Sequence, residues 1–139
     1  MLVLSSSDLD KLRQQFVASA GLIVASLDDK IEKDEVDHIL GVLANYTVFP
    51  TDFLNMISES GKVDEIFGDS IQKILQMNPG ERIPMMQYLI KVGLANRDIS
   101  KKEVEFFFKI GEELMGLSHK EVVQVLAEQI TTGFMPELF

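Results

Sequence analysis

Apolar residues recur at helical spacing along almost the whole chain, and no stretch shows the sustained alternation of apolar and polar residues that marks a half-exposed strand. The spacing predicts about seven helices, which cover residues 8–26, 32–45, 51–59, 62–77, 81–95, 100–115 and 118–131. The connections between them are short, so successive helices are expected to pack as antiparallel or crossing neighbours. The pattern therefore predicts an all-α fold, a single bundle of helices.

Several of these helices begin with residues that can satisfy the free N–H groups of a first turn. Ser100 with Glu103, and Ser118 with Glu121, have the spacing of a capping box. The segment Asn78-Pro79-Gly80-Glu81 places a cap, then a proline at the first helical position, then an acid in the first turn. These signals place the helix starts more firmly than apolar spacing alone.

One short segment is repeated. The sequence DDKIEKDEV at residues 28–36 returns as NRDISKKEV at residues 96–104, 68 positions later, and an apolar helical run precedes each copy. A repeated segment indicates that one structural unit is built twice. We therefore expect one domain over residues 1–139, with two halves related by a pseudo-twofold axis. The apolar segment 134–139 is then a tail that folds back on the bundle, docks on a partner or continues into a longer natural chain.

Composition and charge favour some classes of protein for this chain and disfavour others. The 139 residues are 46% hydrophobic and 25% charged, which is typical of a globular domain, and there is no cysteine for a disulfide or thiolate site. The net charge of −9 disfavours binding to nucleic acid or to anionic lipid and favours divalent cations or basic partners. The apolar run of residues 16–27 is too short to span a bilayer and predicts a buried helix. Asp8 and Asp10 argue against a signal peptide, so we expect a cytoplasmic protein without direct membrane insertion.

The repeated segments gather oxygen-bearing side chains in two turns between helices. The first turn has Asp28, Asp29, Glu32 and Glu35, and the second has Asn96, Asp98, Ser100 and Glu103. Carboxylate and amide oxygens are ligands for calcium, magnesium or manganese, so a divalent cation is one hypothesis for each turn.

Helix capping is the competing interpretation of the same residues. A glutamate at the third helical position after Ser100 is what a capping box requires, and acids in a first turn complement the helix dipole. Against capping alone, four acids close together in the first copy repel one another unless a cation lies among them. An EF-hand is excluded, because counting from Asp28 places Lys33 where glycine is needed and Ile39 where a bidentate glutamate is needed. Both interpretations stay open at the level of sequence.

Other candidate constellations are weaker. Glu35 and His38 have the Glu-x-x-His spacing of di-iron bundles, but no second such pair exists in the chain. His38 falls away from the apolar stripe of its helix, so we expect it to be solvated, and His119 is expected to be an exposed first-turn residue. No general base or nucleophile lies beside the acids in sequence, so the chain is not predicted to be an enzyme.

The residues around the two turns resemble a known family. Residues 25–35 and 95–103 are similar to the Ala…Asp-Gly-x-Ile-x-x-x-Glu signature of the tellurite-resistance TerB-like domains, and so is the later Gly116-Leu117-Ser118 before a helix. The resemblance implies an all-helical domain of two related halves, found alone or attached to larger proteins that include a membrane-anchored J-domain co-chaperone. It also implies a link to stress responses and multiprotein assemblies, with acidic residues proposed to bind divalent metal and no firmly attached enzymatic activity.

Carried over by position, the acidic residues of the family motif correspond to Asp28 and Glu35 in the first copy and to Glu103 in the second. The second copy has Asn96 in place of the aspartate, and Asp29 and Arg97 stand where the motif has glycine. These departures weaken the metal hypothesis for the second turn and direct attention to the first.

Two functions from different classes follow. The first is a non-catalytic TerB-like binding module that acts through protein partners, with a divalent cation bound by the acidic turns. The alternative is a metal-dependent enzyme or metal-handling protein that uses the same carboxylates. A third interpretation is that the turns only cap helices and the domain is a spacer or subunit.

Overall fold

The computed structural model describes residues 6–27, 31–95 and 99–134, and every regular element in these ranges is helical. Seven α-helices are described, and their bounds agree closely with those predicted from sequence: α1 (Ser6–Ser26), α2 (Lys33–Leu43), α3 (Pro50–Glu59), α4 (Val63–Met77), α5 (Arg82–Leu94), α6 (Lys101–Lys109) and α7 (His119–Phe134). A short 3-10 helix, η1 (Pro79–Glu81), precedes α5, and a π-helical segment, η2 (Ile110–Leu114), follows α6. The all-α prediction is therefore confirmed.

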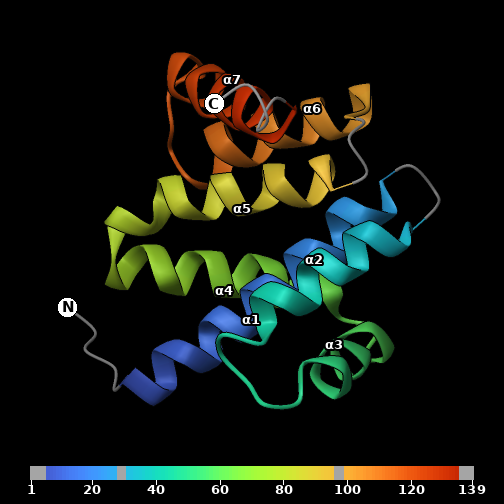
Figure 1. Ribbon diagram of the computed structural model, residues 1–139. Coiled ribbons are helices and arrows are strands. Elements are labelled where there is room, and N and C mark those ends of the chain that lie inside the picture. Colours follow the sequence, from blue (N-terminus) through green and yellow to red (C-terminus); the bar gives the residue numbers. More distant parts are fainter. Residues whose placement is uncertain (1–5, 28–30, 96–98, 135–139) are drawn as a thin grey trace.

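Helix α1 runs through the middle of the molecule and contacts α2, α3, α4 and α5 (Figure 1). Six consecutive residues, 16–21, are buried, although a surface helix would bury only one stripe. The apolar run that begins at Phe16 thus forms a helix covered on several sides, as its sequence predicts. Ser19, the polar residue in this stretch, is fully buried and donates its hydroxyl hydrogen bond to the carbonyl of Gln15 at 2.6 Å.

Helix α5 is the second helix with neighbours on several sides. It contacts α1, α2, α6 and α7, and it buries residues on almost every turn: Met85, Met86, Tyr88, Leu89, Ile90, Val92 and Gly93. Helix α4 packs along α1, and α3 packs against both α1 and α2 (Figure 1). The hydrophobic core therefore lies around α1 and α5, and the shorter helices close it from outside.

Helices α1, α2 and α5 meet at Gly21. A Cβ atom at this position would lie 2.6 Å from Cγ1 of Ile39 and 2.8 Å from the hydroxyl oxygen of Tyr88. The Tyr88 hydroxyl donates a hydrogen bond of 2.7 Å to the backbone carbonyl of Val17, one turn before Gly21. Only a residue without a side chain allows the three helices to come this close.

The helix predicted over residues 100–115 is not regular to its end. After α6 the backbone widens into η2, in which the amide of Met115 donates to the carbonyl of Ile110 at 3.1 Å. Gly116 then adopts a φ of 68°, a left-handed conformation that ends the helix. A prediction from apolar spacing cannot detect this change, because one wider turn shifts the spacing of the apolar residues by only a single position.

The contact at Gly21 predicts opposite effects for two Gly→Ala substitutions. Gly21→Ala should lower the free energy of unfolding by about 1–3 kcal/mol, because the added methyl group collides with Ile39 and Tyr88. Gly41→Ala should raise it by about 0.5–1 kcal/mol, because that exposed position in α2 has nothing within 4 Å and alanine favours the helix. Urea unfolding of the two variants measures both effects. Equal changes in the two variants would contradict a tight contact at Gly21.

Candidate functional site

The first acidic turn leads into α2 through a capping interaction. The side-chain oxygen Oε1 of Glu35 accepts a hydrogen bond of 3.0 Å from the backbone amide of Glu32, and Glu35 is buried with 3% of its surface exposed. Glu32, the residue at the cap itself, is partly exposed. The candidate ligands Asp28 and Asp29 lie outside the described residues. One carboxylate of the predicted cluster thus closes the first turn of α2.

The second turn leads into α6 in the same way. Oε1 of Glu103 accepts from the Ser100 amide at 3.1 Å, and the Glu103 amide donates to the Ser100 hydroxyl oxygen at 3.1 Å. Glu103 is buried with 1% exposed, and its carboxylate lies against the α5 backbone at Gly93, where a Cβ atom would collide with it. Asn96 and Asp98 lie outside the described residues. The capping box predicted at Ser100 is confirmed.

A third capping box, at Ser118 and Glu121, has no acidic turn beside it. The Ser118 amide donates to Oε1 of Glu121 at 2.9 Å, and the Glu121 amide donates to the Ser118 hydroxyl oxygen at 3.1 Å. Hydrogen bonds from the backbone and side chain of Ser118 lower the pKa of Glu121, which is exposed. The three helix starts therefore have the same pattern of hydrogen bonds. Glu35 and Glu103 differ from Glu121 because they are buried.

The structure describes only some of the residues that were predicted to bind a metal ion. Of the seven carboxylate and amide side chains predicted as metal ligands, the structure describes three, Glu32, Glu35 and Glu103, and the last two are each held at the start of a helix by a backbone amide. Within the described ranges, no group of three or more acidic or histidine side chains is arranged to hold a metal ion.

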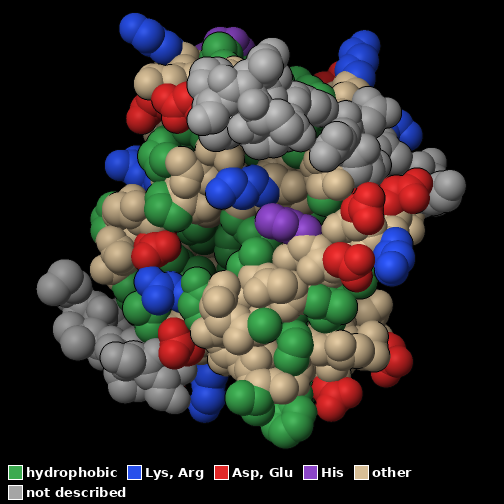
Figure 2. Space-filling model, in the orientation of Figure 1, with side chains coloured by type: hydrophobic (Ala, Val, Ile, Leu, Met, Phe, Trp, Pro, Cys, Tyr) green, Lys and Arg blue, Asp and Glu red, His purple; other side chains and the backbone are tan. Residues whose placement is uncertain are grey.

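A groove between α2 and α5 is a different kind of site, which the sequence did not reveal. One part of the groove is a hollow of about 220 Å³ lined by His38, Val42, Pro84, Gln87, Tyr88 and Lys91. A second hollow of about 100 Å³ shares Val42, Pro84 and Tyr88 with the first and reaches down to Phe16 and Val17 of α1. We call the two together the α2–α5 groove. On this face of the molecule, hydrophobic side chains are recessed between charged ones (Figure 2).

The floor and the ends of the α2–α5 groove differ in character. Tyr88, whose exposed fraction is 9%, forms the shared floor, and burial raises the pKa of its hydroxyl far above the ordinary value, so that the group stays a neutral hydrogen-bond donor. At one end Arg13 and Glu81 form an ion pair with 2.7 Å between Nη2 and Oε1. Lys91 stands at the other end, exposed and without an ion-pair partner among the described residues. The groove is thus apolar in its centre and carries one uncompensated cation.

The prediction that His38 is solvated is wrong. Its ring stacks on the ring of Tyr88 with centroids 6.1 Å apart, and its Nε2 atom is buried with no hydrogen-bond partner among the described residues. Burial and, to a smaller extent, the charge of Lys91 lower the pKa of His38 below its ordinary value. On α2 the buried positions are Glu35, Ile39 and Leu43, so the inward stripe is wider than its apolar residues alone indicate. Had Glu35 been counted as an inward residue, His38 and Val42 would have fallen on the edge of that stripe facing α5.

The prediction for the second histidine, His119, is confirmed by the structure. His119 is exposed and stacks on Phe108 with ring centroids 4.6 Å apart. Phe107 is fully buried, and Phe106 and Phe108 pack against the core, so this aromatic run contributes to packing. None of the described helices has the length and apolar character needed to cross a membrane.

A comparison of the chain with profiles of known protein families, with curated proteins and with solved structures found no match.

The setting of His38 predicts a specific loss of stability in acid. Because the pKa of His38 is lower in the folded chain than the ordinary 6.5, the unfolded chain binds more protons as the pH falls through that range. The contribution of His38 is therefore fully present above about pH 6.5 and is lost as the pH falls through the folded-state pKa. His38→Gln should flatten the dependence of unfolding free energy on pH between about pH 7 and pH 5, measured by urea unfolding.

A second variant, Lys91→Met, tests the cause of the lowered pKa of His38. It removes the smaller cause of the lowered pKa and leaves burial in place, so it should reduce the pH dependence without abolishing it. A His38→Gln profile parallel to that of the unsubstituted chain would contradict a partly buried, neutral His38 ring.

Proposed function

We propose that this chain is a non-catalytic, TerB-like binding module that acts through protein partners and receives an apolar group of a partner in the α2–α5 groove. The observation that supports this function is the groove itself, with a buried aromatic floor and Val42 and Pro84 along its walls. Its hollows of about 100 and 220 Å³ are smaller than most ligand pockets, which run from roughly 300 to 1,000 Å³. Such a space suits one apolar side chain better than a whole cofactor.

The family resemblance adds a setting to this proposal. Members of the TerB-like family are linked to stress responses and to multiprotein assemblies, and an interaction module fits that role. The net charge of −9 favours basic partners at long range. In the groove, binding energy would come from burial of apolar surface, at roughly 25 cal/mol for each Å² removed from water.

We infer also that the two halves, α1–α3 and α5–α7, are related by a pseudo-twofold axis. Positions 68 residues apart share their burial: Ile39 with Phe107, Leu54 with Val122, Ile57 with Val125, Val24 with Val92, and Glu35 with Glu103. Contacts between helices recur as well, since α1 contacts α2 and α3 as α5 contacts α6 and α7. These correspondences support a duplicated unit that extends beyond the short repeated segment.

The groove predicts binding of a neutral apolar probe. N-phenyl-1-naphthylamine should bind the unsubstituted chain with an increase in fluorescence, and Val42→Glu should weaken its binding at least tenfold, because the substitution places a carboxylate in the groove. Val123→Glu is the matched control, since Val123 is 44% exposed on α7, outside the groove. Equal binding by the two variants, with unchanged circular dichroism, would contradict the groove as the binding site.

A divalent cation at the acidic turns is the second candidate, either as a structural ion of the module or, in the alternative class, as the metal of an enzyme. The buried carboxylates at the start of α2 and of α6 favour it, because each brings an acid to the helix start that adjoins its turn. The first copy is the better candidate, since it keeps both motif acids, Asp28 and Glu35, and adds Asp29.

Thermal melting in calcium, magnesium or manganese tests the cation proposal. A cation at about 100 times its dissociation constant adds about 2.7 kcal/mol to the stability of the folded chain, and Asp28→Asn with Glu35→Gln should abolish the increase. Glutamine keeps an oxygen that can accept from the Glu32 amide, so the cap survives while the charge is lost. Glu35→Ala, which removes the cap as well, should cost about 1–2 kcal/mol even without metal. A metal-dependent increase that persists in the double variant would exclude the first turn.

A further inference from the structure

Exposed apolar side chains are concentrated around the start of α3. Among the described residues, three of the five large hydrophobic side chains that are strongly exposed lie between positions 48 and 56: Val48 (84% exposed), Phe49 (65%) and Met56 (56%). Folded chains tolerate single exposed apolar residues, but a cluster of them marks a surface that another molecule covers. Together with Phe53, which is partly buried, these residues form what we call the α3 face.

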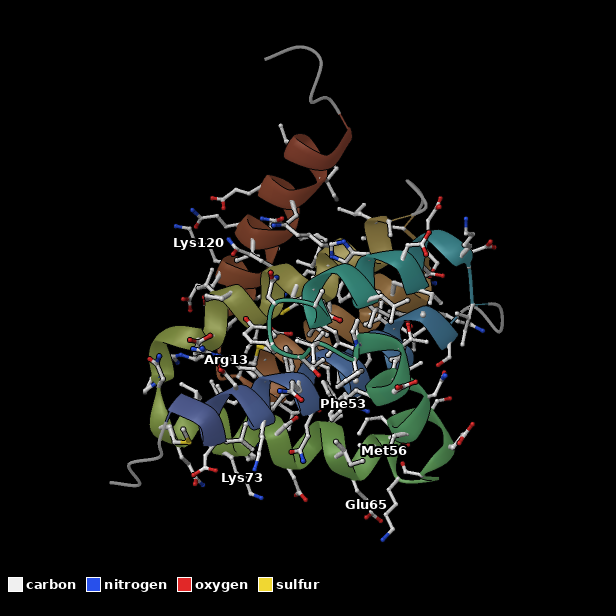
Figure 3. All side chains as sticks on the ribbon, turned by 60° about the horizontal axis from the view of Figure 1, so that its bottom comes forward. Arg13, Phe53, Met56, Glu65, Lys73 and Lys120 are labelled. Atoms are coloured by element: carbon white, nitrogen blue, oxygen red, sulfur yellow. The ribbon has the colours of Figure 1, made fainter. Side chains whose placement is uncertain are left out.

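Helical geometry places Phe53 and Met56 on one side of α3, and the cap residue Phe49 directly precedes them on the same stripe. Phe49, Phe53 and Met56 follow the i, i+4, i+7 spacing of a helical stripe. Leu54 and Ile57 are buried and hold the other side of α3 against the bundle. Figure 3, viewed from the side that is the bottom of Figure 1, shows Phe53 and Met56 on the near part of the molecule.

Among the described side chains of α7, the corresponding positions form no such face. At the positions 68 residues after Phe53 and Met56, α7 has Glu121 and Gln124, both exposed and polar, whereas the buried positions Leu54 and Ile57 correspond to the buried Val122 and Val125. The buried residues of α3 and α7 are therefore apolar at matching positions, whereas the exposed residues differ in polarity. Exposed aromatic and methionine side chains are thus not needed to build this kind of helix pair, and their presence on α3 needs another reason.

The surroundings of the α3 face are acidic. Residues 48–69 contain five acids, Asp52, Glu59, Asp64, Glu65 and Asp69, all exposed, against the single base Lys62. Asp52 and Glu59 lie four residues before and three residues after Met56, so they neighbour it on the helix surface. Glu65 of α4 lies on the same side of the molecule as Met56 in Figure 3.

We propose that the α3 face is a docking surface for a basic amphipathic helix of a partner protein, separate from the α2–α5 groove. Apolar side chains of such a helix would cover Phe49, Phe53 and Met56, and its lysine or arginine residues would pair with Asp52, Glu59 and Glu65. Charge selects this occupant over two others. A second copy of the chain would bring a like-charged acidic rim against the first, and an anionic membrane would be repelled by the same carboxylates.

The test uses a fluorescent 18-residue helical peptide with leucines at i, i+3, i+4 and i+7 spacing and lysines on the flanks. Anisotropy should show that it binds, and that a peptide of the same design with glutamates in place of the lysines binds at least tenfold more weakly. Phe49→Ser with Met56→Gln should weaken the lysine peptide at least tenfold. Both substitutions suit their sites, since serine is a favoured cap before α3 and glutamine is a good helix former.

Two further variants separate charge from apolar contact and the face from the groove. Asp52→Asn with Glu59→Gln should weaken the lysine peptide several-fold and leave a peptide with neutral glutamine flanks unchanged. Val42→Glu, in the groove, should not affect peptide binding. Equal binding of the lysine and glutamate peptides, or no effect of Phe49→Ser with Met56→Gln, would overturn the proposal.

A second copy of the chain or a membrane, as the occupant of the α3 face, would each give a different result. A dimer in sedimentation velocity that Phe49→Ser with Met56→Gln dissolves would assign the α3 face to a second copy of the chain. Co-sedimentation with phosphatidylserine vesicles that the same variant abolishes would assign it to a membrane. Either result would overturn a basic helix as the partner.

Discussion

The close approach of α1 to α2 and α5 at Gly21 is the contact on which the rest of the structure depends. Ile39 from α2 and the Tyr88 hydroxyl from α5 occupy the space that a side chain at Gly21 would fill. The hydrogen bond from Tyr88 to the Val17 carbonyl fixes α5 against α1 at the same level. The ring of Tyr88 is also the floor of the α2–α5 groove, so the packing that stabilises the bundle sets the shape of the proposed binding site. A change at Gly21 would therefore alter both stability and binding.

Much of the fold could be predicted from sequence because local signals agree with one another. Apolar spacing gave the seven helices, and the capping boxes at Ser100 and Ser118 form as their spacing predicts. The burial of α1 on several sides follows from its long apolar run, since a stretch of helix with few polar residues needs neighbours on several sides. The wide turn of η2 has no local signal in the sequence, and it lies where α7 packs closely: at Gly111 a Cβ atom would lie 2.7 Å from Val122 of α7.

The candidate site was less predictable, for a reason visible at Glu35 and His38. Polar residues are assigned to the surface by default, yet Glu35 is buried because its carboxylate accepts from the Glu32 amide and so retains a hydrogen bond. His38, three residues after Glu35, lies near the same side of α2 and contacts the ring of Tyr88. Groove residues such as Val42 of α2 and Lys91 of α5 share no motif and come together only when the two helices pack. A site made by two helices distant in sequence leaves no local pattern to detect.

The duplication that we infer would explain where new function can arise in such a fold. A repeated unit must keep the residues that bury, and positions such as Leu54 and Val122 do so in the two halves. Exposed and half-exposed positions are free to differ. At His38 the second half has Phe106, which packs on Phe67 with ring centroids 6.1 Å apart, while His38 itself borders an open groove. The α3 face, and the edge of the groove at His38, thus lie where the first half departs from the second.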